Sequence, residues 1–147
     1  MEPKPYRQAF PALTDENHIE TSPADAEYNC IGHAADSRLW WWPGEVIGGN
    51  HYWPSGVAQD VTIEAFVSAY ETVGYADCGQ DGRFEAGFEK VAIYARDGAP
   101  KHAARQVDAS YWTSKLGRTV DISHQLEHLE GTYYGEVVRY LKRRKSR

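Results

Sequence analysis

Apolar residues recur at helical spacing near the middle of the chain. Thr62 precedes the repeat and is a residue type that caps helix N-termini, and Gly74 follows it and is a residue type that ends helices. The repeat predicts an amphipathic helix that starts after Thr62 and packs one face against a core. Its apolar positions follow the i, i+3, i+4, i+7 pattern: Ile63, Phe66, Val67 and Tyr70.

The second half of the chain changes to the alternation that is typical of strands. Residues 90–96 alternate and are rich in β-forming types, an Asp-Gly turn follows at 97–98, and residues 102–107 return as the partner strand. Residues 111–116 predict a third strand. Residues 136–141 are ambiguous between strand and helix, and their valines and tyrosine favour a strand.

Three further segments complete the secondary-structure prediction. A run of small residues predicts a short helix that starts near Cys30, with Asn29 or Asp25 as its cap. Residues 121–129 predict another short helix, because Asp121 or Ser123 could cap it and a glycine follows it. Residues 75–87 are rich in turn-forming types and predict a loop.

The order of these elements predicts an α+β fold in which N-terminal helices pack on an antiparallel sheet. The length of 147 residues suits one domain. We expect an extended N-terminal arm over residues 1–27, a single domain over residues 28–141 and a basic tail over residues 142–147.

Composition narrows the function classes. A net charge of −5 argues against nucleic acid as the main partner. No apolar run approaches the roughly 20 residues of a membrane-spanning helix, and residues 1–10 lack the apolar core of a signal peptide. Two cysteines are too few for a disulfide scaffold, so we expect a cytoplasmic protein. Nothing in the sequence indicates a cofactor, and the oligomeric state stays open.

Cys30 is the first candidate for chemistry. A helix N-terminus stabilises a thiolate and lowers the pKa of a cysteine placed there. His102 opens a predicted strand just after a turn, where its imidazole could serve as the base of a Cys30–His102 pair. The alternatives are an inert buried thiol and a histidine that merely ends a hairpin.

A catalytic pair needs supporting groups. Gln106, Ser114 and Asp121 are the candidates for orienting His102, and the sequence does not choose among them. Asn29 could lend its amide to an oxyanion hole or could instead cap the helix.

The chain order resembles a known superfamily. A cysteine that opens a helix, followed much later by a histidine that opens a strand and a polar residue on the next strand, is similar to the papain-like superfamily. This superfamily includes papain and the bacterial cell-wall cysteine endopeptidases and amidases. The resemblance implies a papain-like fold with Cys30 as nucleophile and His102 as base. In the cell-wall enzymes, however, the histidine usually leads the strand that here begins at Lys90, so an inactive relative is the alternative.

The chain more closely resembles an uncharacterised bacterial domain family over about residues 28–135. That resemblance implies a shared fold and no particular activity. It rests on these segments: Tyr28-Asn29-Cys30-Ile31, Trp41-Trp42-Pro43, Tyr52-Trp53-Pro54, His102-Ala103-Ala104-Arg105-Gln106, Trp112-Thr113-Ser114-Lys115-Leu116-Gly117 and Asp121-Ile122-Ser123-His124.

Aromatic residues gather between Trp40 and Trp53. They could close a small core, or they could wall a groove for a sugar, a peptide or a protein. The candidate binding residues are Asn29, Trp41, Trp42, Tyr52, Trp53 and Trp112.

A zinc site is a rival interpretation of the same region. The pairs Cys30/His33 and His124/His128 have spacings that tetrahedral zinc can use, although only one thiolate would contribute. We expect no metal.

Two functions therefore stand. The first is a cysteine hydrolase or acyltransferase that acts on an amide or thioester bond of a peptide, a protein or a small acyl substrate. The second is an inactive interaction domain that binds a protein, peptide or sugar through the Trp40–Trp53 segment.

Overall fold

The computed structural model describes residues 6–44, 51–116 and 118–145. Most of the strands form one sheet of seven, in the order β1-β8-β7-β6-β5-β9-β4, and every pairing within it is antiparallel. The strands of this sheet are β1 (Ile19–Ser22), β4 (Ala76–Gly79), β5 (Phe88–Arg96), β6 (Ala99–Gln106), β7 (Trp112–Lys115), β8 (Asp121–His124) and β9 (Glu136–Arg144).

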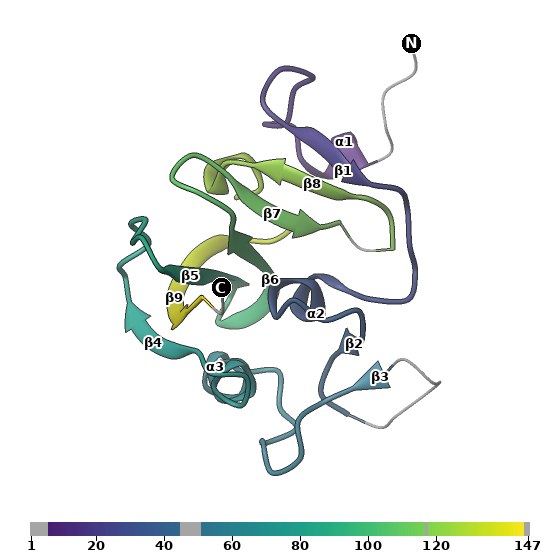
Figure 1. Ribbon diagram of the computed structural model, residues 1–147. Helices are drawn as coiled ribbons and strands as arrows, with labels where there is room; N and C mark the ends of the chain where they lie inside the picture. Colours follow the sequence, from purple (N-terminus) through teal and green to yellow (C-terminus); the bar gives the residue numbers. More distant parts are fainter. Residues whose placement is uncertain (1–5, 45–50, 117, 146–147) are drawn as a thin grey trace.

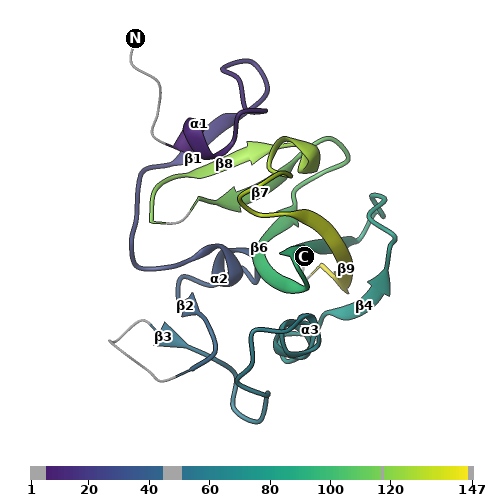
Figure 2. The ribbon, with the colours of Figure 1, turned by 180° about the vertical axis from the view of Figure 1, so that it is seen from behind.

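The helices are short, and a separate parallel pair of strands accompanies them. The helices are α1 (Tyr6–Ala9), α2 (Cys30–Ala34), α3 (Ile63–Glu71) and the 3-10 turn η1 (Leu126–His128), and the pair is β2 (Trp40–Trp41) with β3 (His51–Tyr52). Figures 1 and 2 show α1 and β1 at the β8 end of the sheet and α3 beside β4 at the other end. The α+β prediction is confirmed. Among the described residues, no helix is long and apolar enough to cross a membrane.

Alternation along the central strands gives the sheet two buried faces. Val91, Ile93 and Ala103 point to the side that α2 and α3 cover, which we call the α2/α3 face. Ala92 and Ala104 point to the opposite side, which we call the far face, where the N-terminal segment and η1 pack. Because successive side chains of a strand point to opposite faces, each residue of β5 to β8 belongs to one face only.

The predicted helix in the middle of the chain is confirmed as α3. The Thr62 side chain accepts a hydrogen bond from the Ala65 N–H at 3.1 Å, so Thr62 is the N-cap. Phe66 is fully buried against the α2/α3 face and contacts two indole rings of the Trp40–Trp53 segment, those of Trp42 and Trp53. The helix thus holds the aromatic segment against the sheet.

The strand predictions at 90–96, 102–107, 111–116 and 136–141 are confirmed by β5, β6, β7 and β9. Two other segments differ from expectation. Residues 76–79, expected in a loop, form the edge strand β4, which pairs with β9. Residues 121–124, expected in a helix, form β8 between β7 and β1, because Asp121 is buried on one face and Ile122 on the other.

Both ends of the chain contribute to the sheet. Within the segment that we expected to be an extended arm, α1 forms and β1 pairs with β8. Within the expected basic tail, β9 continues to Arg144. Its cations bind carboxylates of the same domain, with Lys142 at 3.0 Å from Glu85 and Arg143 at 2.5 Å from Glu89.

Candidate functional site

Asn29 fixes the start of α2 and ties it to β2. Its Oδ1 atom accepts hydrogen bonds from the Gly32 N–H at 3.0 Å and the Trp41 N–H at 2.9 Å. Its Nδ2 atom donates to the Trp41 carbonyl at 2.7 Å. The side-chain amide is therefore used by the backbone, as a helix N-cap and as a clamp on Trp41. Of the two roles that the sequence left open for Asn29, this geometry matches the cap, and the Trp41 carbonyl takes up one of the two Nδ2 hydrogens.

Cys30 is the first residue of α2, as predicted, but its thiol is not activated. The side chain lies against the Ala103 backbone on the α2/α3 face. Burial raises the pKa of the Cys30 thiol to about 11, because the thiolate would lose its hydration. Nearby backbone groups and Lys115 favour the thiolate, but their effect is smaller than that of burial. The expected lowering of the Cys30 pKa by the helix start is therefore wrong.

His102 lies on the far face. It stands opposite Tyr94 in the β5–β6 pairing, and its ring stacks on Tyr134 with the ring centroids 4.0 Å apart. Both tyrosines belong to the far-face core, whereas Cys30 belongs to the α2/α3 core. The sheet thus separates Cys30 from His102, because adjacent positions 102 and 103 of β6 point to opposite faces. The structure does not bring the expected catalytic pair together.

His102 belongs instead to a buried chain of hydrogen bonds with Ser114 and His124. The Ser114 Oγ atom lies 2.9 Å from the His102 Nε2 atom and 2.7 Å from the His124 Nε2 atom. The His124 Nδ1 atom lies 2.7 Å from the Gln125 carbonyl, which can only accept, so Nδ1 carries the proton and Nε2 accepts from Ser114. The Ser114 oxygen then accepts from the His102 Nε2–H.

This assignment leaves the His102 Nδ1 atom unprotonated, and this buried atom has no hydrogen-bond partner. Burial and the neighbouring histidines lower the pKa of His102 well below its usual range. Of the three groups predicted to orient His102, Ser114 is the one in contact. His124 was considered as a zinc ligand and was not among the catalytic candidates, and residues 121–124 were expected in a helix. Treating them as a strand would have placed His124 opposite Trp112 and beside Ser114.

The other two orienting candidates lie elsewhere. Asp121 is buried on the α2/α3 face, where its Oδ2 atom accepts the Tyr28 hydroxyl at 2.7 Å and lies 3.9 Å from the His33 Nδ1 atom. Gln106 donates through Nε2 to the Gly82 carbonyl at 3.2 Å, at the end of β6. Neither contact involves His102. Asp121 connects β8 to the segment that precedes α2, and Gln106 connects β6 to the loop at Gly82.

The zinc interpretation needs four ligands that the sheet keeps apart. Cys30 and His33 lie on the α2/α3 face, and His124 lies on the far face beside Ser114. Within residues 6–44, 51–116 and 118–145, no group of three or more potential ligand side chains gathers at one point.

The aromatic segment divides between core and surface. Trp41 and Trp112 are buried, and Tyr52 and Trp53 are partly buried against the α2/α3 core. Trp40 and Trp42 flank Trp41 and, with Asn29 and Cys30, line an open hollow of about 320 Å³ that we call the indole hollow. Apolar side chains form nearly all of its wall. Of the predicted binding residues, Trp42 and Asn29 line this hollow. The other two lining residues, Cys30 and Trp40, were not among them.

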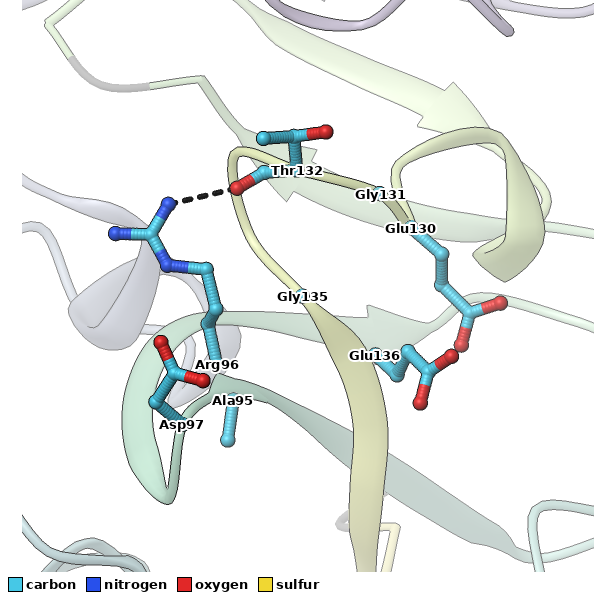
Figure 3. A pocket seen from close by; sticks show the side chains of 8 residues that line it. All are labelled: Ala95, Arg96, Asp97, Glu130, Gly131, Thr132, Gly135 and Glu136. Atoms are coloured by element: carbon cyan, nitrogen blue, oxygen red, sulfur yellow. Dashed lines mark hydrogen bonds between the residues drawn. The ribbon is translucent and has the colours of Figure 1, made fainter.

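A second hollow, of about 620 Å³, lies between the β5–β6 turn and residues 130–136 (Figure 3). Its polar groups hold the turn in place, since the Arg96 guanidinium donates to the Thr132 carbonyl at 2.7 Å and Glu130 accepts from the Val137 N–H at 3.0 Å. A Cβ at Gly135 would collide with the Ala95 carbonyl, so the two strands approach closely here. We interpret this hollow as part of the structural contact between the β5–β6 turn and the start of β9.

Comparison with known proteins places the chain in a family. The family model described as a domain of unknown function (DUF7689) matches residues 19–142. No curated protein and no solved structure matches the chain. The match begins at β1 and ends within β9, so it includes every strand of the seven-stranded sheet except the end of β9 after residue 142. The chain therefore belongs to the DUF7689 family.

Proposed function

We propose that this domain binds a segment of another protein and that the indole hollow receives an apolar side chain of that segment. The observation that supports this proposal is the hollow itself, an open depression lined by Trp40, Trp42, Asn29 and Cys30. Its volume of about 320 Å³ lies at the lower end of the range for ligand sites and suits one or two side chains. Tryptophan is among the residue types that dominate the energy of protein interfaces.

The chemistry of the wall favours a protein segment over a sugar. Sugars are bound through hydrogen bonds to several hydroxyl groups. Asn29, the polar residue of the hollow, already uses its amide oxygen and one of its two N–H groups on Gly32 and Trp41. An apolar side chain needs no such partners and gains free energy by leaving water. Two unpaired cysteines suit a reducing compartment such as the cytoplasm, where we expect this binding to occur.

A cysteine hydrolase is supported less well. Papain-like chemistry requires a thiolate within hydrogen-bond reach of an imidazole. Cys30 and His102 lie on opposite faces of the sheet, and burial raises the pKa of the Cys30 thiol to about 11. The Cys30 thiol is therefore poorly suited to attack a carbonyl.

The test is an NMR titration with blocked amino acids as probes. N-acetyl-phenylalaninamide and N-acetyl-leucinamide should shift the indole N–H signals of Trp40 and Trp42, with Kd values on the order of millimolar. N-acetyl-serinamide should not, because its side chain has little apolar surface to bury. Trp40→Ala should abolish the shifts.

Tyr133→Ala is the matched control, because Tyr133 is an exposed aromatic residue that contacts far-face residues. This variant should keep the response of the wild type. Circular dichroism of each variant shows whether it is folded. Equal shifts with the serine and phenylalanine probes, or unchanged binding in a folded Trp40→Ala variant, would refute the proposal.

A further inference from the structure

Arg118 contacts one of the residues that line the indole hollow, with its guanidinium over the Trp40 ring. The guanidinium carbon lies 4.4 Å from the ring centroid, a distance at which a cation is attracted to the aromatic face. Arg118 is exposed to solvent. The stacking therefore holds a positive charge against Trp40, a lining residue of the hollow.

Arg118 has no carboxylate partner within the described part of the chain. The hydrogen bond that it makes there, to the Ala26 carbonyl, is long at 3.5 Å. Other arginines of this acidic protein do have carboxylates close by: Arg38 with Asp25, Arg83 with Asp81, Arg105 with Asp36, Arg139 with Asp77 and Arg143 with Glu89. The charge of Arg118 is therefore available to a ligand.

Two further cations lie over the Tyr28 ring, Arg38 at 4.6 Å and Lys115 at 5.0 Å from its centroid. Each has a partner of its own, since Arg38 binds Asp25 at 2.8 Å and Lys115 donates to the Thr119 carbonyl at 2.6 Å. Arg118 differs from Arg38, because no described carboxylate lies within ion-pair distance of it.

We propose that the segment bound in the indole hollow carries an acidic residue next to its apolar anchor, and that this carboxylate binds Arg118. The inference rests on the proposed function, because it concerns the ligand of the same hollow. A guanidinium presents parallel N–H groups that match the two oxygens of a carboxylate. Stacking on Trp40 restricts the guanidinium before the ligand arrives, so less side-chain entropy is lost on binding.

The experiment compares peptide probes that differ only in charge. Acetyl-Phe-Asp-amide and acetyl-Asp-Phe-amide are titrated by NMR against their Asn counterparts at about 20 mM salt. In at least one order, the Asp probe should bind about threefold more tightly than its Asn counterpart, the scale of an exposed ion pair. The difference should largely disappear at about 0.5 M salt, where charges are screened within a few ångströms.

Arg118→Gln should remove the preference for Asp and leave the Kd of the Asn probes unchanged. The matched control is Arg144→Gln, because Arg144 is also an exposed arginine over an aromatic ring, that of Phe88, and its loss changes the net charge equally. Arg144→Gln should keep the preference.

The outcomes separate the two proposals. Equal binding of the Asp and Asn probes in both orders, or an Asp preference that survives in Arg118→Gln, would overturn the role of Arg118 and leave the apolar hollow as a binding site. Absence of binding by every probe would overturn the proposed function and this inference together.

Discussion

The buried imidazole of His124 should make the stability of this domain depend on pH. Burial lowers the pKa of His124 from 6.5 to about 4, because the charged ring would lose its hydration between β7 and β1. In the unfolded chain the imidazole titrates near 6.5. Above that pH the ring is neutral in both states and stability is at its full value. As the pH falls from 6.5 to about 4, the unfolded chain binds a proton that the folded protein does not.

The size of this loss in stability follows from the difference between the pKa values of His124 in the folded and unfolded states. At about 1.4 kcal/mol for each pH unit, His124 alone should lower the free energy of unfolding by about 3 kcal/mol by pH 4. Burial also lowers the pKa values of His102 and His33, so the total loss should be larger. Urea unfolding at pH 7.5 and pH 4.5, followed by tryptophan fluorescence, measures the loss directly.

Substitution measures how much of this loss in the free energy of unfolding is due to His124. His124→Gln removes the titrating group, so the fall in stability between the two pH values should be roughly 2 to 3 kcal/mol smaller than in the wild type. Ile122→Val is the control on the same strand, since Ile122 is fully buried and the change removes no titrating group. It should cost about 1 kcal/mol at both pH values and leave the fall unchanged. The same fall in His124→Gln as in the wild type would refute this reasoning.

Three further predictions follow from packing and burial. Gly135→Ala should destabilise the fold about 2 kcal/mol more than Gly98→Ala, because both glycines have φ near 80° but only position 135 faces a backbone carbonyl; equal losses in urea unfolding would contradict the close strand contact. Phe66→Ala should cost about 4 kcal/mol, since the ring is fully buried, and an unchanged melting temperature would remove α3 from the core. Iodoacetamide at pH 8 should alkylate the partly exposed Cys78 at least about tenfold faster than Cys30, because the Cys30 thiolate is the scarcer and less accessible one; faster labelling of Cys30, identified by mass spectrometry, would revive the nucleophile hypothesis.

Local signals in the sequence determined most of the secondary structure. Thr62 and the apolar spacing after it fixed α3, and the Asp-Gly turn at 97–98 fixed the β5–β6 hairpin. Asn29 gave the start of α2 because its side chain caps a helix within its own segment. Each of these features depends on residues a few positions apart, which a pattern along the chain can detect.

Only the tertiary structure decided which of the candidate residues meet. Cys30 and His102 each occupy the type of element that the sequence predicted, yet the alternation of β6 turns His102 away from α2. His124 reaches Ser114 only because residues 121–124 add to the sheet as a strand. The face on which a side chain lies is set by the pairing register of its strand within the sheet. A shift of the register by one residue would move every side chain of that strand to the opposite face. The sequence alone contains the candidates, and long-range pairing selects their partners.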